Sequence, residues 1–252
     1  MTKIQEHGGM AMDWKRHRRE AHSQTRLQEF LRQIVYGGND GIVTTFAIVA
    51  GFAGAASEGV AQIGGLAVLV FGLANLFADG VSMGLGEFLS ARSEHDLYHR
   101  QRALELDEIA RNPEHERMEL FEILRQRGLP AGQADTVTTH LADHPNIMAD
   151  LMLTYEFGMH SPEEDNPAMN GLFTFGSFIL FGAVPLLPYF LRPADDFSFW
   201  LSVIATGLAL LSLGLLRWYA TGERALRCIL ETLLVGTTCA LVAYGVGWVV
   251  GG

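Results

Sequence analysis

Apolar residues gather into five long runs along this chain, separated by charged segments. Each run is near or above the roughly 20 residues that an α-helix needs to cross the hydrocarbon core of a bilayer. Tryptophan and tyrosine residues lie near the run ends, as amphipathic rings do at a membrane interface. Pro185 and Pro188, late in the third run, predict a kink or an early helix end there. The pattern predicts five membrane-spanning helices, at residues 34–54, 63–89, 168–190, 197–216 and 228–250.

One long polar segment, residues 91–167, separates the second and third runs. Helix breakers at 112–113 and 128–132 divide it into a predicted helix at 93–111, another at 114–127 and shorter helical pieces. No strand-like alternation appears, so the predicted fold class is all-α, a five-span helical membrane protein with an inserted helical domain. The predicted parts are a basic N-terminal segment (1–33), spans one and two (34–90), the insert (91–167) and spans three to five (168–252).

Segments rich in Lys and Arg alternate along the chain with segments that have few or none. The first 33 residues and the insert carry seven each, whereas the loop at 55–62 and the C-terminal end carry none. Because basic loops stay on the cytoplasmic side, the N-terminus and the insert are expected in the cytoplasm and the C-terminus on the opposite side. The charged N-terminal segment has no apolar core of its own, so no cleavable signal peptide is expected.

Charge is distributed unevenly along the chain. There are 18 Lys and Arg against 28 Asp and Glu, a net charge of −10, and the insert holds 16 acids against seven basic residues. An acidic balance disfavours nucleic acid as a partner, because phosphate binding needs clustered basic residues. It favours a cation, which the insert would concentrate locally. Cys228 and Cys239, inside the fifth run, fit neither a disulfide framework nor a zinc site.

Four acids interrupt the apolar runs: Asp40, Asp79, Glu87 and Glu231. A charge near the bilayer centre costs roughly 2.5–3.5 kcal/mol on insertion scales, so such residues usually mark an ion path, a proton relay or a buried pair. Glu231 is explained as readily by snorkelling to the cytoplasmic interface. Asp40 and Thr44 lie one turn apart after the glycine-rich start of the first run and form a polar spot there. The alternative to an ion path is that Asp40 is hydrogen-bonded where two helices pack through glycines.

The second run carries polar residues at helical spacing. Asp79, Met83 and Glu87 recur every four residues and therefore share one helix face. Carboxylates are hard ligands and a thioether is soft, so this face suits a borderline ion such as Fe(II) or Mn(II) better than Mg or Ca. Ordinary packing of the methionine is the alternative.

The insert contains two pairs of glutamates on either side of the break at residues 112–113. Glu105 with Glu108, and Glu116 with Glu119, are three residues apart, so each pair places two carboxylates on one helix face. A turn between the helices would bring both pairs around a cation. The alternative is that these acids stabilise a helix N-terminus or pair with neighbouring arginines on a solvated face.

Several familiar catalytic motifs are missing. The Glu-x-x-His pair of di-iron bundles and a phosphate loop of the Walker type are both absent from the sequence. His140 and His144 have metal-ligand spacing but lack the glutamate of a zinc protease motif. The sequence thus gives no support to di-iron oxidation or ATP-driven pumping.

These features together resemble the vacuolar iron transporter family. The resemblance covers nearly the whole chain from Tyr36 and rests on residues 39–44 in the first span, residues 82–90 ending the second, the acidic insert, Asn166–Pro167 and residues 185–188. It implies a homodimer of five-span subunits, with an ion path between the first spans of the two protomers. The positions that match the family's pathway residues are Asp40, Met83 and Glu87.

The insert is similar to the family's cytoplasmic metal-binding domain. Where that domain can offer a further glutamate beside its methionine, this chain has Leu153, and Asp150 or Met148 could compensate. The positions that match the family's metal ligands are Glu105, Glu108, Glu116, Glu119, Met152 and Glu156.

The predicted function is proton-coupled transport of Fe(II) out of the cytoplasm, with Mn(II) or Zn(II) as further candidates. The ion would pass Asp40, Thr44, Asp79, Met83 and Glu87. No enzymatic activity and no prosthetic group are expected; the partners are the metal ion, protons, lipid and a second copy of the chain. A bacterial inner membrane is the expected location, or the vacuolar membrane in a eukaryote. The alternative is a membrane-anchored iron-binding protein or ferroxidase, against which acids within the spans argue.

Overall fold

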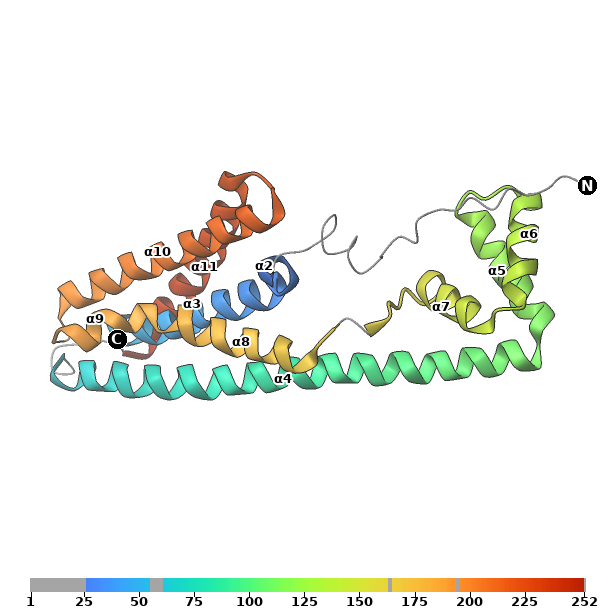
Figure 1. The fold of residues 1–252 in the computed structure, drawn as a ribbon. Coiled ribbons are helices and arrows are strands. Elements are labelled where there is room, and N and C mark those ends of the chain that lie inside the picture. Colours follow the sequence, from blue (N-terminus) through green and yellow to red (C-terminus); the bar gives the residue numbers. More distant parts are fainter. Residues whose placement is uncertain (1–25, 55–60, 163–164, 194, 252) are drawn as a thin grey trace, which may run out of the picture. The chain divides into compact units, whose positions relative to one another are not determined.

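The computed structural model describes residues 26–54, 61–162, 165–193 and 195–251, and every regular element within those ranges is a helix (Figure 1). This confirms the all-α fold class. The predicted basic segment at 1–33 and the loop at 55–62 lie mostly outside the described residues. The chain divides into two compact units, which we call the apolar unit (residues 1–83 and 173–252) and the acidic unit (residues 84–172).

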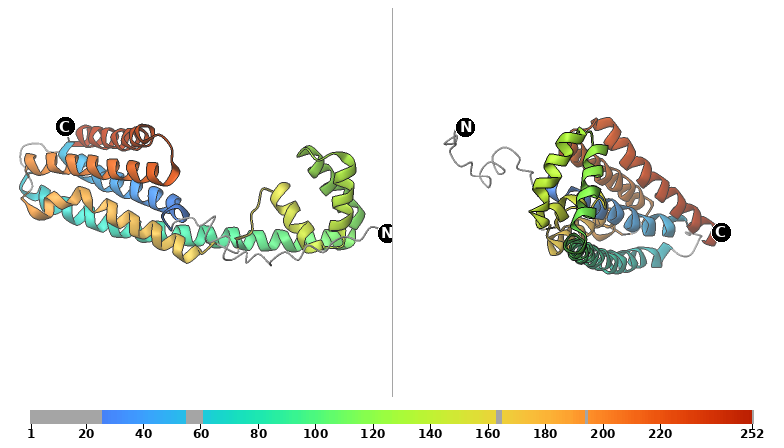
Figure 2. Two further views of the ribbon diagram at one scale, coloured as in Figure 1. Left: turned by 45° about the horizontal axis from the view of Figure 1, so that its top comes forward. Right: turned by 90° about the vertical axis from the view of Figure 1, so that its right-hand side faces the viewer.

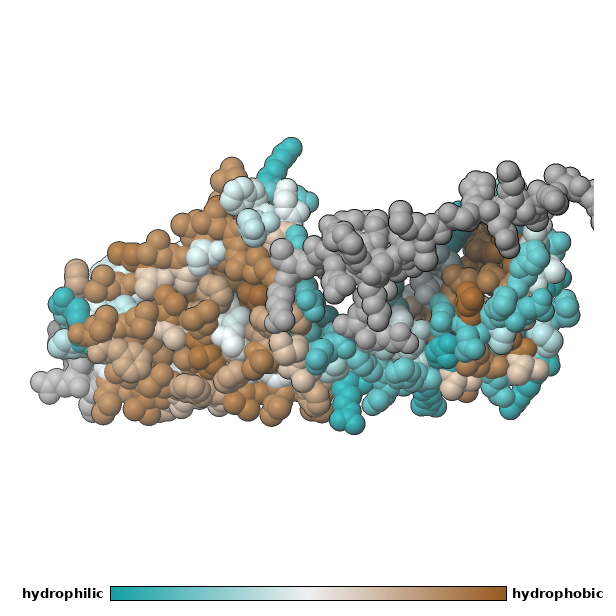
Figure 3. Space-filling model, viewed as in Figure 1, coloured by the Kyte–Doolittle hydropathy of each residue, from teal (hydrophilic) through white to brown (hydrophobic). Residues whose placement is uncertain are grey.

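The apolar unit presents a surface that is hydrophobic over most of its area (Figure 3). Large side chains such as Leu66, Trp200 and Leu234 are exposed on it, as expected where lipid rather than water surrounds the helices. Its elements are α2 (Arg26–Glu29), α3 (Leu31–Gly54), the first part of α4 (Ala61–Arg111), most of α8 (Pro167–Gly182), η2 (Val184–Leu186), α9 (Leu187–Leu191), α10 (Asp196–Thr221) and α11 (Ala225–Gly251).

Four helical stretches among the described residues are long and apolar enough to cross a membrane. They are Gly65–Arg111, Pro167–Leu191, Asp196–Thr221 and Ala225–Val250. Helix α3 has 24 residues, but Gln33, Asn39 and Asp40 lower its hydropathy, and it is not one of the four. A membrane protein of several spans is therefore supported, while the fifth span stays a prediction.

Helix α4 is continuous over 51 residues, from Ala61 to Arg111. The sequence predicted a span ending at 89 and a separate helix from 93, but nothing between these positions breaks a helix, because residues 90–92 are Ser, Ala and Arg. Only about 20 residues of α4 are needed to cross a bilayer, so a span would use less than half of its length.

The third predicted span is interrupted near its end, as its two prolines predicted. Helix α8 ends at Gly182, and the short elements η2 and α9 follow. The hydroxyl of Ser202 on α10 donates to the carbonyl of Pro185 at 2.7 Å, which satisfies a backbone group that the interruption leaves without a helical partner.

The core of the apolar unit is built where α3 packs against α10 and α11 (Figure 2) and where α4 packs against α8. Phe178, Leu76 and Leu186 are fully buried in its main cluster. Backbones approach closely at glycines: a Cβ on Gly247 of α11 would meet the carbonyl of Gly51 on α3. Small residues allow such close helix contacts in membranes, where packing rather than water drives association.

Replacing Gly247 by alanine should lower the melting temperature of the purified protein in detergent by about 5 °C, because backbone atoms of α3 cannot move aside cheaply. Gly245, two residues earlier on the same helix, is the matched control, because a Cβ added there would meet no atom within 4 Å. Equal melting temperatures for Gly247→Ala and Gly245→Ala would show that α3 and α11 are not in this close contact.

The acidic unit contains the second half of α4 and three further helices, α5 (Pro113–Gln126), α6 (Ala131–Ala142) and α7 (Pro145–Tyr155). The predicted breaks are confirmed: α4 ends before Asn112, and Gly128, with φ of 99°, takes a left-handed conformation that favours glycine. Its small apolar core includes Ile109, Leu120 and Met148, while its outer surface is mainly hydrophilic (Figure 3).

Candidate functional site

Two acids interact within the apolar unit. Asp40 on α3 and Asp79 on α4 are both half-buried, and their carboxylates are close enough to interact electrostatically. Among the described residues, no Lys or Arg forms an ion pair with either carboxylate. Two like charges at this proximity, without a basic partner, favour binding of a proton or a metal cation.

The other predicted pathway residues lie on the same two helices. The Thr44 hydroxyl donates to the Asp40 backbone carbonyl at 2.7 Å, which leaves the lone pairs of its oxygen available as ligands. Met83 follows Asp79 by one turn of α4 and packs against the apolar core, as its packing alternative predicted. Glu87, half-buried one turn further along α4, belongs to the acidic unit.

An apolar groove of about 820 Å³ lies beside the acid pair. Residues from α3, α4 and α11 line it, starting at Ala47, three positions after Thr44, and at Ala78, next to Asp79. Asn75, one turn before Asp79, contributes an amide to this lining. The groove therefore continues the face of α3 and α4 that carries the acids.

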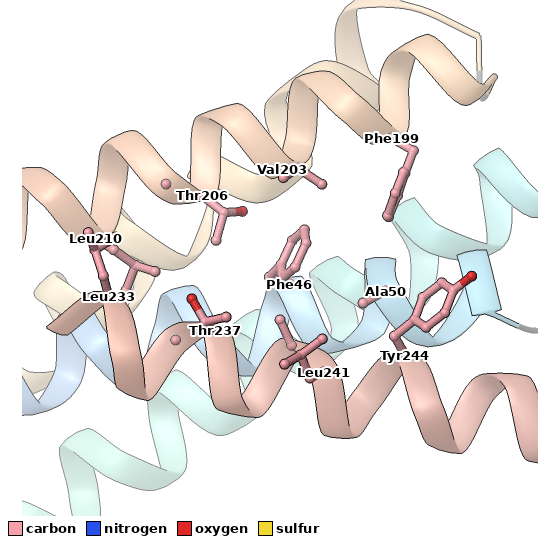
Figure 4. A pocket seen from close by; sticks show the side chains of 13 residues that line it. Phe46, Ala50, Phe199, Val203, Thr206, Leu210, Leu233, Thr237, Leu241 and Tyr244 are labelled. Atoms are coloured by element: carbon pink, nitrogen blue, oxygen red, sulfur yellow. The ribbon is translucent and has the colours of Figure 1, made fainter. Parts of the chain in front are cut away.

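A second cavity, of about 310 Å³, lies between α3, α10 and α11 and has no acid in its lining (Figure 4). Its polar groups come from Thr206, Thr237 and Tyr244, and the Thr206 hydroxyl already donates to the Ser202 carbonyl at 2.7 Å. Without a carboxylate, this cavity does not offer a site for a divalent cation.

The five glutamates predicted in the insert lie near one another in the acidic unit. Glu105 and Glu116 are joined by a side-chain hydrogen bond, and both are almost fully buried, at 2% and 4% exposure. Glu108, Glu119 and Glu156 are close enough to act on them electrostatically. The break after α4 and the end of α7 thus gather five carboxylates from α4, α5 and the C-terminus of α7.

Crowding changes the protonation of this cluster. Burial, followed by repulsion from Glu116, Glu156 and Glu108, raises the pKa of Glu105 from 4.5 to about 7. Burial and neighbouring glutamates also raise the pKa of Glu116 and of Glu156. Protons therefore occupy part of the cluster near neutral pH, and a cation would displace them.

One oxygen of each buried carboxyl, Oε1 of Glu105 and Oε2 of Glu116, has no hydrogen-bond partner. Buried polar atoms of this kind are uncommon and point to an absent ligand or water. Among the described residues, no three His, Cys, Asp or Glu side chains are already arranged to hold a metal ion. The five glutamates are thus close together but would have to adjust to coordinate a cation.

The arginines that the alternative assigned to Glu105 and Glu108 pair with other acids, while Glu108 is exposed and Glu116 lies in the first turn of α5. Arg111 pairs with Asp107 at 2.8 Å, and Arg102 pairs with Asp150 at 2.7 Å. Neither arginine is therefore the partner of Glu105 or Glu108. Glu119 forms an i,i+4 contact with His115 at 3.1 Å, which a protonated histidine would strengthen.

The docking of α7 against α4 depends on a pairing that the sequence did not predict. Arg102 on α4 donates to Asp150 at 2.7 Å and to Asn146 at 3.1 Å, so it holds two successive turns of α7. Asp150 therefore connects α7 to α4 through its Oδ1, and its role as a substitute for the glutamate that is missing at position 153 stays a prediction. Met152, fully buried in the apolar core, remains a predicted ligand.

Glu231 on α11 has two arginine partners. Arg217 on α10 donates to it at 3.1 Å and Arg227 donates to it at 2.9 Å. This pairing connects α10 to α11 and accounts for an acid within the fifth run. His140 and His144, which the sequence excluded as a zinc motif, are both exposed.

Comparisons with known proteins show the family of this chain. A family model described as the VIT family matches residues 31–248. The chain is 35% identical over 219 residues to vacuolar iron transporter 1 of Eucalyptus grandis, 86% of this chain and 85% of that one. It is 31% identical over 238 residues to the vacuolar iron transporter of Toxoplasma gondii, 91% and 76% of the two chains.

A third relative, vacuolar iron transporter 1 of Arabidopsis thaliana, is 35% identical over 218 residues, 86% of this chain and 84% of its own. All three relatives are named as transporters and not as enzymes. The matches cover most of both chains and confirm the resemblance drawn from the motifs. By these matches, the chain belongs to the VIT family.

Proposed function

We propose that this chain transports Fe(II) out of the cytoplasm in exchange for protons. The observation that carries the proposal is the pair Asp40 and Asp79, two interacting carboxylates in an apolar helical unit with no described basic partner. A divalent cation offsets two negative charges that are costly within a bilayer. Similarity to proteins named vacuolar iron transporters supports iron as the cargo.

The ligand types along α3 and α4 fit such an ion. Asp40, Asp79 and Glu87 supply carboxylate oxygens, Thr44 a hydroxyl oxygen and Met83 a thioether. Mixed hard and soft ligands suit Fe(II) and Mn(II) better than Mg or Ca, and Mn(II) and Zn(II) are secondary cargo candidates. The ion would pass from one carboxylate to the next, each site binding weakly enough to release it.

The acidic unit would collect the ion before transport. Five gathered carboxylates raise the local cation concentration, and the unpartnered oxygens of Glu105 and Glu116 are available to bind it. Met152 would add a thioether to these five carboxylates. On the cytoplasmic side, as the distribution of Lys and Arg predicts, this unit would remove free Fe(II) from the cytoplasm.

Proton exchange follows from the chemistry of the ligands. A carboxylate binds metal only when it is deprotonated, so each binding step releases a proton and each arriving proton displaces metal. A more acidic compartment on the far side would therefore unload Asp40 and Asp79 there. Protons and Fe(II) would compete for the same oxygens in opposite directions.

A second copy of the chain would complete the ion path. The 820 Å³ groove beside the acid pair leaves the face of α3 with Thr44 and Ala47 incompletely covered. A homodimer joined along the α3 helices would cover this face and bring two copies of Asp40 together around the ion.

Flux through reconstituted protein tests the proposal. Liposomes that contain the full chain, with a more acidic interior, should take up external Fe(II) several times faster than liposomes without a pH gradient, as read from an enclosed iron-sensitive dye. Competition with Mn(II) and Zn(II) would rank the cargo. Uptake that ignores the gradient would reject proton exchange, and iron oxidation without uptake would favour the membrane-anchored ferroxidase.

A further inference from the structure

A pocket of about 620 Å³ lies at one end of the apolar unit; it shares no lining residue with the acid pair's groove and reaches along α3 to Asn39, next to Asp40. It is lined by the start of α3, the end of α10 and the start of α11, including Arg32, Tyr36, Arg217, Glu231 and Val235. Its walls combine arginine side chains with apolar ones. A pocket of this composition suits an amphiphile whose head is an anion.

The charged part of this pocket carries an excess of positive charge. Arg217 is fixed by donating to Glu231 at 3.1 Å, to Thr232 at 3.2 Å and to the Cys228 carbonyl at 3.5 Å. Arg227 donates to the same glutamate at 2.9 Å and lies 4.0 Å from Glu223, so Arg217 and Arg227 are matched by two acids and the excess comes from Arg32.

Arg32 adds a charge that is not balanced. Its side chain is exposed, and the ion pairs of the described residues do not include it. Among the side chains that the structure describes at this end of the apolar unit, four arginines are exposed or half-buried, against three glutamates (Glu29, Glu223 and Glu231); the arginines are Arg32, Arg217, Arg224 and Arg227. At the opposite end the described basic residue is Arg192, which lies 3.9 Å from Asp195.

The apolar part of the pocket continues into the hydrophobic surface of the helices. Leu31 and Val35 on α3 and Val235 on α11 line it, and Leu230 and Leu234 on α11 are exposed beside it at 54% and 69%. Trp218 and Tyr219 lie at the same end of α10, as aromatic residues do at the headgroup level of a membrane. An anion held at Arg32 would thus sit at the interface, with apolar helix faces extending into the bilayer.

We propose that this pocket binds the phosphate of an anionic phospholipid, with Arg32 as its partner and the acyl chains along α3 and α11. Guanidinium groups bind phosphate through paired hydrogen bonds, and basic pockets between helices at the cytoplasmic side of membranes are suited to anionic headgroups. Soluble phosphate shares the headgroup chemistry but would leave the apolar walls unused. Lipid binding here does not depend on metal transport.

Native mass spectrometry of the purified full chain with phosphatidylglycerol and phosphatidylcholine of identical acyl chains tests this site. The wild-type protein should retain phosphatidylglycerol in preference, and Arg32→Gln should weaken that binding about fivefold. Arg224→Gln is the matched control, because Arg224 is exposed at the same end, has no described ion-pair partner and does not line the pocket. It should change binding less than about twofold.

A second variant separates the pocket from surface charge. Val235→Trp fills the apolar wall and keeps every charge, so it should also weaken phosphatidylglycerol binding. Equal losses in Arg32→Gln and Arg224→Gln, no effect of Val235→Trp, or no preference for the anionic lipid would overturn the proposal. Displacement of the lipid by millimolar inorganic phosphate would assign the pocket to a soluble phosphate compound instead.

Discussion

An Asp40→Asn variant should transport Fe(II) about 100-fold more slowly than the wild-type protein. The substitution keeps the size and polarity of the side chain but removes the charge that faces Asp79 on α4. A 100-fold loss corresponds to about 2.7 kcal/mol, comparable to the cost of one charge near the bilayer centre. The initial rate of uptake into liposomes, at a fixed pH gradient, measures the effect.

Asp196→Asn provides the matched control for this variant. Asp196 is exposed in the first turn of α10, and no ion pair of the described residues includes it. The control should transport at the wild-type rate, and both variants should elute and melt like the wild-type protein in detergent. If Asp40→Asn transported as fast as Asp196→Asn, the acid pair would not belong to the ion path.

The ends of helices could be predicted from local chemistry, whereas the continuity of one long helix could not. Asn112–Pro113 and Gly128 end helices in the structure where the sequence predicted, because proline removes a donor and glycine permits a left-handed turn. Hydropathy falls near residue 90, so the sequence predicted two helices where α4 is a single one. Hydropathy reports the polarity of a segment and not the course of its backbone, so one continuous helix was predicted as two.

In the candidate metal cluster, too, the sequence predicts what depends on neighbouring residues and misses a contact between residues far apart in the chain. The i,i+3 spacing of Glu105 with Glu108 follows from the sequence, and a turn after α4 was enough to anticipate that Glu116 would come near them. Docking of α7 depends on Arg102 reaching Asp150, 48 residues away. No local pattern encodes that ion pair, so the sequence alone left Asp150 as a candidate compensating ligand.

Metal binding by the acidic unit should weaken steeply with acidity because of Glu105. Its pKa of about 7 means that a proton competes for the site, so affinity for Mn(II) should fall about tenfold for each pH unit below 7. Glu105→Gln removes this competing proton together with one ligand. The variant should bind Mn(II) more weakly at pH 7.5 and show a flatter pH dependence, measured by equilibrium dialysis of the full chain.

Glu105 should also make the stability of the metal-free protein depend on pH, but in the opposite direction, because that stability should fall as pH rises. Since the folded-state pKa of Glu105 lies above its ordinary 4.5, the fold favours the protonated carboxyl. The protonated carboxyl stabilises the folded protein fully below pH 4.5. This contribution is lost as pH rises through 7, a change of roughly 3 kcal/mol in the free energy of unfolding. Wild-type protein should therefore melt lower at pH 8 than at pH 6, and Mn(II) should reverse the loss.

Glu94→Gln separates this effect from a general loss of negative charge. Glu94 lies on the same helix, is exposed and has no ion pair among the described residues. Its variant should keep the wild-type pH dependence of both melting and Mn(II) binding, whereas Glu105→Gln should flatten both. A steep pH dependence that survives in Glu105→Gln would place the competing proton on another carboxyl, with Glu116 the next to test, since burial raises its pKa too.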